Sequence, residues 1–208
     1  AAEHWKIYLV TMLISFVSVV PFIIYAEVKR KMKRVFVGCV ALLLIAEIVL
    51  WGAGPHFWEL IAGVQLFFLA FNLMEALLPS LISKESPAGY KGTAMGIYST
   101  SQFLGVAIGG SLGGWVDGLF DSQTVFLAGA LLAMLWLFVA STMKEPRYVS
   151  SLRVEIPDDV AIGDALQQRL EATEGVSEVL IVPEERSAYV KIDSKVTNRF
   201  EVEQALKA

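Results

Sequence analysis

Five long stretches of almost uncharged residues alternate with short polar segments over the first 143 residues. They cover residues 5–27, 35–52, 57–83, 92–116 and 122–143. At ~1.5 Å per residue, a helix of about 20 residues crosses the ~30 Å hydrocarbon core of a bilayer. The pattern therefore predicts an all-α membrane bundle of five spanning helices within residues 1–147.

The segment 92–116 differs from the other four because glycine recurs along it at intervals near four. In water each glycine inside a helix would cost ~1 kcal/mol relative to alanine, whereas in a membrane a bare face lets another helix approach closely. We therefore expect this helix to be buried among other helices. Generic packing and a surface along which helix bundles move are the two alternatives. The glycines concerned are Gly105, Gly109, Gly110, Gly113 and Gly114.

The pattern changes at residue 148, where polar and apolar positions begin to alternate. Leu152, Val154 and Ile156 indicate a strand with one buried face, and two further strands are predicted at 178–182 and 187–192. A helix capped by Asp159 is predicted after the first strand, and a second helix containing Phe200 is predicted at 198–207. The order β-α-β-β-α predicts a small α+β ferredoxin-like domain over residues 148–208.

Composition supports a membrane protein that carries a small soluble domain. Of the 208 residues 55% are hydrophobic and only 18% are charged, against ~25% charged in soluble domains. Residues 151–208 are acidic, with seven Lys and Arg against twelve Asp and Glu, which argues against nucleic-acid binding. The single cysteine, Cys39, excludes an intrachain disulfide and a cysteine-based metal site. With no phosphate-binding loop or nucleophile–base pair in the sequence, we expect no enzyme, no metal and no cofactor.

Loop charge predicts the orientation of the helices. Basic residues are found in the segment 29–34, at Lys84 and Lys91, and between Lys144 and Arg147, whereas residues 53–57 and 118–123 contain no Lys or Arg. Because basic loops stay in the cytoplasm, the C-terminal domain is expected to be cytoplasmic and residue 1 to lie outside. No secretory signal precedes residue 1, so we expect the chain to be a fragment whose N-terminal half is missing.

Polar residues within the predicted spans are the candidates for chemistry, since a charge at mid-bilayer costs ~2.5–3.5 kcal/mol on insertion scales. Gln65, Asn72 and Glu75 share one face of the third span. We interpret Glu75 as a group that takes up and releases a proton, with a purely structural hydrogen bond as the alternative. Glu47, in the second span, is a weaker candidate, and Ser99 and Gln102 are candidate cavity-lining residues.

Two motifs resemble the major facilitator superfamily. The glycines Gly105-x-x-x-Gly109-Gly110-x-x-Gly113-Gly114 resemble the antiporter signature G-x-x-x-G-P-x-x-G-G, although Gly110 replaces proline and the signature belongs to the fifth helix. The basic loop resembles the acidic-basic loop of the superfamily, with glutamate in place of aspartate and its glycines missing. A loop that is basic only because it is cytoplasmic is the alternative. Its residues are Glu27, Lys29, Arg30, Lys31, Lys33 and Arg34.

The five spans as a set resemble the last five of the twelve helices of proton-linked drug-efflux members. This resemblance implies a multi-pass protein of the bacterial inner membrane that exports small amphipathic compounds by alternating access in exchange for protons. It implies membrane lipid, protons and an unidentified small molecule as partners, and we expect a monomer. Because the C-terminal domain is acidic and would lie beside basic cytoplasmic loops, we expect it to dock on residues 29–34 or on loops of the missing half and to regulate transport, with a passive folded tail as the alternative. The alternative to a transporter is a membrane-anchored sensor or scaffold whose helices only tether that domain.

The strand order of the C-terminal domain also resembles that of heavy-metal-associated domains. Those domains hold their metal with a Cys-x-x-Cys motif between the first strand and the first helix. Residues 156–163 occupy that position here and contain no cysteine. Binding of a soft metal in that way is therefore not expected.

Overall fold

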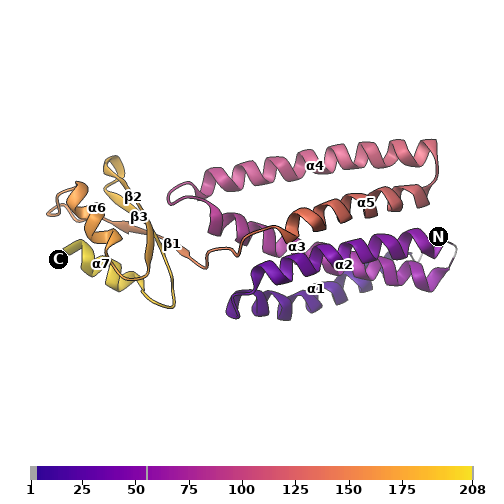
Figure 1. The fold of residues 1–208 in the computed structure, drawn as a ribbon, viewed down its shortest axis with the longest axis horizontal. Coiled ribbons are helices and arrows are strands. Elements are labelled where there is room, and N and C mark those ends of the chain that lie inside the picture. The colour runs from indigo at the N-terminus through magenta and orange to yellow at the C-terminus, as the bar shows by residue number, and fades with distance from the viewer. Residues whose placement is uncertain (1–3, 55, 208) are drawn as a thin grey trace. The chain divides into compact units, whose positions relative to one another are not determined.

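A computed structural model describes residues 4–54 and 56–207, and the side chains of all of these except residues 4–8 and 207. Five long helices are followed by a small α+β domain (Figure 1). The helices are α1 (His4–Val28), α2 (Met32–Ala53), α3 (Phe57–Glu85), α4 (Lys91–Leu119) and α5 (Ser122–Ser141). The predicted all-α bundle with an α+β domain is therefore confirmed.

The predicted boundaries are close to the observed ones, with one correction in the basic segment. Helix α2 begins at Met32, so only residues 29–31 lie between α1 and α2. Lys33 and Arg34 belong to the first turn of α2, and Glu27 belongs to the end of α1. What was predicted as a basic loop is mostly a tight turn with basic helix ends.

Four of the five helices, α1, α2, α3 and α5, are long and apolar enough to cross a membrane. Helix α4 has the length but falls outside this group. Its many glycine, serine and threonine residues dilute its apolar content.

The chain divides into two compact units. One unit contains Ala1–Ser80 and Thr100–Glu145, and the other contains Leu81–Ser99 and Pro146–Ala208. In the first unit α2 packs mainly on α5. The buried residues of α5 include the small Ala130 and Ala133, and small side chains let packed membrane helices approach closely. Phe36 of α2 lies edge-to-face against Trp136 of α5, with ring centroids 6.0 Å apart.

The glycine-rich face of α4 is open among the described residues of this chain. No described residue of α4 is buried. A Cβ atom built on Gly105, Gly109, Gly110 or Gly114 would meet nothing within 4 Å, and one on Gly113 would reach only Val125, at 3.8 Å. None of the described helices of this chain covers this face, so burial among other helices stays a prediction.

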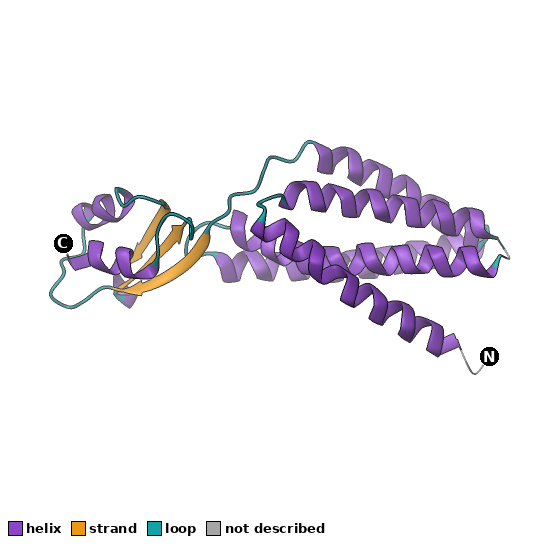
Figure 2. Cartoon of the chain, turned by 90° about the horizontal axis from the view of Figure 1, so that it is seen from below, coloured by secondary structure: helices purple, strands orange, loops and turns teal. Residues whose placement is uncertain are grey.

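The second unit contains a three-stranded antiparallel sheet with two helices (Figure 2). Its elements are β1 (Ser150–Glu155), α6 (Asp164–Glu171), β2 (Val176–Val182), η1 (Pro183–Glu185), β3 (Ser187–Ile192) and α7 (Arg199–Lys207). The strand order β1-β3-β2 is that of a ferredoxin-like sheet without its fourth strand. Leu166 and Leu170 of α6 and Val202 and Leu206 of α7 close the core over the sheet.

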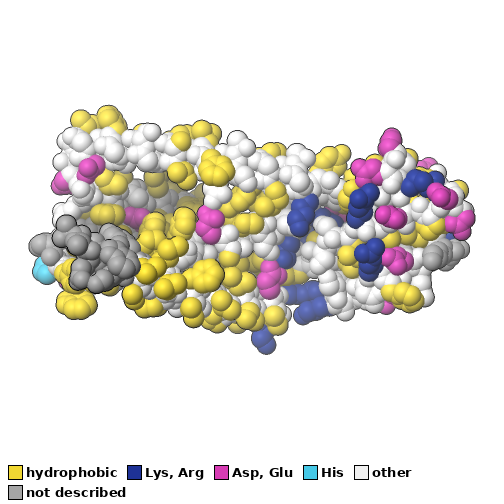
Figure 3. Space-filling model, turned by 180° about the vertical axis from the view of Figure 1, so that it is seen from behind, with side chains coloured by type: hydrophobic (Ala, Val, Ile, Leu, Met, Phe, Trp, Pro, Cys, Tyr) yellow, Lys and Arg dark blue, Asp and Glu magenta, His cyan; other side chains and the backbone are white. Residues whose placement is uncertain are grey.

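One detail of the predicted domain is wrong. Asp159 does not cap α6, which begins five residues later with Gly163 at its N-cap. In α7 the Phe200 side chain is 65% exposed, whereas Val202 is fully buried. Figure 3 shows the division of the surface: apolar side chains gather over the helices, and acidic and basic side chains gather on the α+β domain.

Candidate functional site

Glu75 of α3 and Gln102 of α4 meet side by side in the helical unit. The Nε2 amide of Gln102 donates a hydrogen bond to Oε1 of Glu75 over 2.5 Å. Glu75 is exposed and Gln102 is half-buried. The two candidates, 27 residues apart in sequence, therefore form one polar pair on two predicted membrane helices.

The remaining polar residues of α3 turn toward other neighbours. Gln65 donates through Nε2 to the hydroxyl oxygen of Ser15 on α1, over 2.6 Å, and Ser15 is fully buried. Asn72 lies between Gln65 and Glu75, and its buried Nδ2 has no hydrogen-bond partner among the described residues. The polar residues predicted to share one face of α3 therefore have partners on both α1 and α4, and Asn72 Nδ2 has no acceptor among the described residues.

Glu47 lies in a different place, at the contact of α2 with α5. It is half-buried, and a Cβ atom on Gly129 of α5 would come within 2.8 Å of its Oε2 atom. A larger residue at this position would require the Glu47 carboxyl group to shift. The structure therefore brings Glu47 to a helix–helix contact and not to the Glu75–Gln102 pair.

The basic segment is tied to α3 through its acidic member. Ser80 of α3 donates a hydrogen bond to Oε1 of Glu27 over 2.8 Å. Lys31 Nζ lies 5.9 Å from the centre of the Tyr25 ring, within range of a cation–π contact. Arg30 takes a left-handed backbone conformation, with φ 52°, where the chain turns from α1 to α2.

Ser15 and Ser80 are partners that sequence reasoning missed. A serine inside an apolar helix usually bonds its own backbone, so neither sequence position indicated a contact with another helix. Ser99, the remaining cavity candidate, is half-buried on α4.

In the second unit the side chain of Lys191 on β3 forms a hydrogen bond with the last turn of α3. Lys191 is only 4% exposed, and its Nζ donates to the carbonyl oxygen of Lys84 over 2.7 Å. That carbonyl belongs to the last turn of a helix, where it has no acceptor role within the helix and a cation is favoured. Burial lowers the pKa of Lys191 below 10.5, and the nearby Arg147 lowers it further, although Glu178 and Glu85 act in the opposite direction.

Two further contacts join residues 81–99 to residues 146–208 within the second unit. The backbone N–H of Arg147 donates to Oε1 of Glu85 over 3.2 Å. Gly89 has φ 78°, and a Cβ atom there would overlap the side chain of Leu180 on β2. A cavity of about 420 Å³ lies beside Lys191, lined by charged residues that include Lys84, Glu85 and Glu178.

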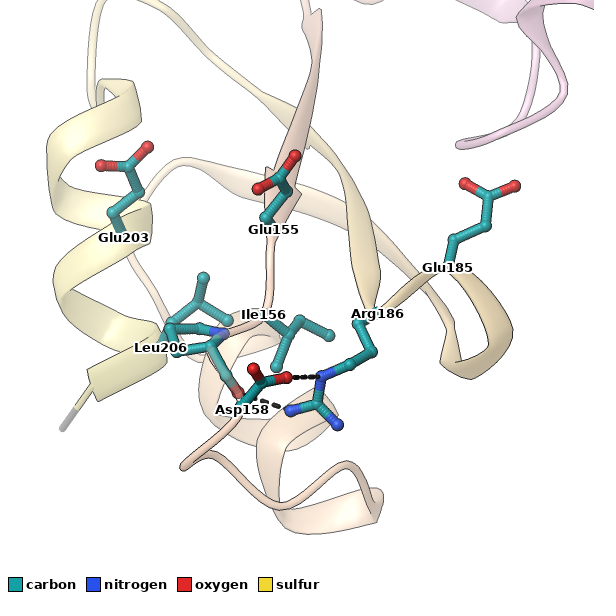
Figure 4. A pocket seen from close by; sticks show the side chains of 8 residues that line it. Glu155, Ile156, Asp158, Glu185, Arg186, Glu203 and Leu206 are labelled. Carbon is teal, nitrogen blue, oxygen red and sulfur yellow. Dashed lines mark hydrogen bonds and ion pairs between the residues drawn. The ribbon is translucent and has the colours of Figure 1, made fainter.

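A second polar cavity, of about 460 Å³, lies in the α+β domain where β1 ends and β3 begins (Figure 4). Arg186 forms one wall, and its guanidinium group points to the segment after β1. Nη2 donates to the carbonyl oxygens of Pro157 and Val160, and Nε lies 3.0 Å from Oδ1 of Asp158. Arg186 therefore fastens two loops of the domain together. Among the described residues no group of three or more His, Cys, Asp or Glu side chains is arranged to hold a metal ion.

Comparison with known proteins agrees with this architecture. Residues 152–208 match the family described as the YajR YAM domain. The chain is 77% identical over 207 residues to the inner membrane transport protein YajR of Escherichia coli (strain K12), a match that covers 100% of this chain and 46% of that protein.

Two more distant relatives match about half of the chain. An uncharacterized transporter of Buchnera aphidicola subsp. Acyrthosiphon pisum is 40% identical over 107 residues, which cover 51% of this chain and 27% of that protein. An uncharacterized MFS-type transporter of Pseudomonas aeruginosa (strain UCBPP-PA14) is 31% identical over 107 residues, covering 51% and 26%. The chain spans less than half the length of each of these relatives. It is the C-terminal part of a YajR-like transporter, and its residues 152–208 form a YajR YAM domain.

Proposed function

We propose that the transporter to which this chain belongs exports small amphipathic compounds across the inner membrane in exchange for protons, by alternating access and without enzymatic activity. The observation that carries the proposal is the pair of Glu75 and Gln102 on two adjacent helices. An ionisable side chain at membrane depth marks an ion or proton pathway more often than a structural contact. Gln102 can donate to the carboxyl group in either protonation state, so the pair would survive the gain and loss of a proton.

Asn72 supports the same interpretation. A buried amide donor without an acceptor costs about 1–3 kcal/mol. Its Nδ2 lacks a partner among the described residues and lies one helical turn from Glu75. Water or a transported compound beside Glu75 would satisfy this donor, as expected of a wet passage.

The experiment is the substitution Glu75→Gln in the intact transporter. The amide oxygen of glutamine can still accept the Gln102 hydrogen bond, so the fold is retained while the exchangeable proton is lost. Proton flux in vesicles, measured on addition of candidate compounds, is expected to fall to background. The matched control is Glu59→Gln, which changes a glutamate in the first turn of the same helix.

Exchange of substrate across the membrane without a proton gradient is measured in parallel. If Glu75→Gln keeps full proton coupling, the assignment of Glu75 is wrong. If the wild-type protein moves neither protons nor any compound tested, the alternative of a membrane-anchored sensor or scaffold is favoured.

We further propose that the YAM domain lies in the cytoplasm and regulates transport through residues 81–99. The support is the bond from Lys191 to the carbonyl oxygen of Lys84, together with the Gly89–Leu180 contact. These contacts join the domain to the segment that connects α3 with α4, the two helices that carry Glu75 and Gln102. Loss of these contacts would therefore change how residues 81–99 connect α3 with α4, and so alter the proposed proton site at Glu75 and Gln102.

The substitution Lys191→Met tests this regulatory role. Methionine keeps the apolar part of the buried side chain but removes the donor to Lys84. The transport rate is expected to change by about fivefold, the range of a typical coupling between sites. Lys195→Met, on an exposed lysine of the same domain, is the control. An unchanged rate in a Lys191→Met protein whose domain is folded would identify a passive tail.

A further inference from the structure

An apolar groove runs between α1, α2 and α3 in the helical unit, away from the Glu75–Gln102 pair. Its volume is about 720 Å³, and its walls are side chains of these three helices. Arg34 is the only charged residue among the described residues that line it, and Tyr25 adds a hydroxyl group at the same end. The groove therefore combines a long apolar wall with a cationic mouth.

The wall contributed by α2 explains how the groove is formed. Arg34, Gly38 and Leu42 are four residues apart, so they follow one another along a single face of the helix. A Cβ atom on Gly38 would meet nothing within 4 Å, which leaves the middle of this face open. Arg34 and Gly38 are both exposed, so the groove opens at the surface of the unit.

The length of the groove matches one leaflet of a bilayer. The eight steps from Arg34 to Leu42 rise about 12 Å along the helix. Half of the ~30 Å hydrocarbon core is ~15 Å. An acyl chain that enters beside Arg34 and reaches Leu42 would therefore remain within one leaflet.

Positive charge is concentrated at the mouth. Lys31 lies over the ring of Tyr25, which itself lines the groove, so a second cation is held at a residue of the groove wall. Three more basic residues lie within the same short segment: Lys29, Arg30 and Lys33. Basic pockets between membrane helices attract anionic headgroups, with ~1 kcal/mol for each Lys or Arg near the surface.

We propose that this groove is a binding site for an anionic phospholipid, with the phosphate at Arg34 and Lys31 and an acyl chain along Gly38 toward Leu42. Such a lipid uses both the cations and the apolar wall. A soluble anion would use only the mouth, and an apolar helix from elsewhere in the transporter would use only the wall. The proposal concerns lipid alone and does not depend on the compound that is transported.

The test is native mass spectrometry of the intact detergent-purified transporter, titrated with phosphatidylglycerol and, separately, with phosphatidylcholine of the same acyl chains. We expect phosphatidylglycerol to bind more tightly. Arg34→Gln should weaken that binding about fivefold, from ~1 kcal/mol for one charge, and leave phosphatidylcholine unchanged. Gly38→Leu, which fills the groove, should weaken both lipids. Lys144→Gln and Gly52→Leu are the matched controls, the first for charge and the second for an open glycine on the same helix.

Several results would overturn the proposal. Equal binding of the two lipids, or no effect of Arg34→Gln, would remove the role of charge. Unchanged binding in Gly38→Leu would show that the groove is not occupied by an acyl chain. Competition by inorganic phosphate at millimolar concentration would indicate a soluble anion instead. Absence of any bound lipid on the wild-type protein would indicate a groove covered by another helix. If Gly38→Leu does not fold, the comparison of Arg34→Gln with Lys144→Gln decides the outcome.

Discussion

Tyr189 and Glu185 form a hydrogen-bonded pair at the surface of the YAM domain. The Tyr189 hydroxyl donates to Oε2 of Glu185 over 2.8 Å. This bond to a carboxylate raises the pKa of Tyr189 above 10.0, and the Glu185 charge adds to it, while the nearby Arg153 opposes it. Because the folded value is raised, the contribution of the pair to stability is present below pH 10.0 and is lost as the pH rises through the folded pKa.

The pair gives a pH-dependent prediction. In wild-type protein the absorbance titration of Tyr189 at 295 nm should have its midpoint above 10.0. Glu185→Gln removes the charge while keeping a weaker acceptor, so the midpoint should move down toward 10.0. The difference spectrum against Tyr189→Phe isolates this residue from the other tyrosines. A midpoint that Glu185→Gln does not move would contradict the assigned cause.

Arg186 combines an unfavourable backbone with favourable side-chain bonds. Its φ of 42° is left-handed, which costs ~1–2 kcal/mol for a residue with a Cβ atom. Its guanidinium group compensates by bonding Pro157, Val160 and Asp158. The strain is therefore held in place by the loop-to-loop connection.

Two substitutions should separate these opposing effects. Arg186→Ala removes the bonds and keeps the strain, so the free energy of unfolding of residues 148–208 should fall by about 1–3 kcal/mol. Arg186→Gly removes the same bonds and also relieves the strain, so it should be less destabilising than Arg186→Ala. Urea unfolding measures both. Equal losses would show that the left-handed conformation carries no cost here.

At the residue scale the sequence indicates which polar groups matter but not what they contact. Gln65, Asn72 and Glu75 stand out because they interrupt an apolar helix. Their partners lie far away in sequence, Ser15 at a separation of 50 residues and Gln102 at 27. Helical periodicity gives a direction around one axis, and it carries no information on which neighbour stands in that direction.

At the scale of elements the five helices and three strands are predictable because apolar length and alternation differ so clearly between the two parts of the chain. Their ends are less predictable. Helix α2 begins inside the basic segment because Lys and Arg are good helix formers and their side chains can extend into water. Helix α6 begins after Gly163, although Asp159 is the residue type preferred at an N-cap. The hydrogen bond from Arg186 to the carbonyl oxygen of Val160 keeps the segment after β1 in a loop conformation.

The glycine face of α4 is uncovered among the described residues of this chain, which is only part of a longer transporter. We predict that this face packs on helices contributed by the rest of the transporter. Gly109→Leu would then separate two helices and reduce transport by about tenfold or more. The control Gly52→Leu, at another glycine whose Cβ position is open, should have little effect. Transport rates in vesicles measure both, and full activity of Gly109→Leu would show that the face is not a packing surface.

At the scale of the whole molecule the chain combines two units that differ in where their apolar side chains lie. The YAM domain has its own closed core, from Val154 to Leu206, and its acidic surface suits water. The helical unit instead exposes large apolar side chains, among them Phe103 at 73% and Phe138 at 70%. In water such a surface would aggregate, and lipid or further helices must cover it. The division at residue 148 could be predicted because composition alone separates these two environments.

The loop charges predict the side of the membrane on which the YAM domain lies, and cysteine labelling can test this prediction. This chain has a single, buried cysteine, so Cys39→Ala, combined with replacement of any cysteine in the rest of the transporter, provides a background without a thiol. Gln123→Cys lies near the start of α5 in a region without Lys or Arg, and Glu184→Cys lies in the YAM domain beyond the basic residues Lys144 and Arg147. Both positions are exposed. Since basic segments remain in the cytoplasm, a membrane-impermeant maleimide should label Gln123→Cys in intact spheroplasts and Glu184→Cys only after lysis. Labelling of Glu184→Cys before lysis would place the domain outside the cell and would contradict both the orientation and the proposed regulation from the cytoplasm.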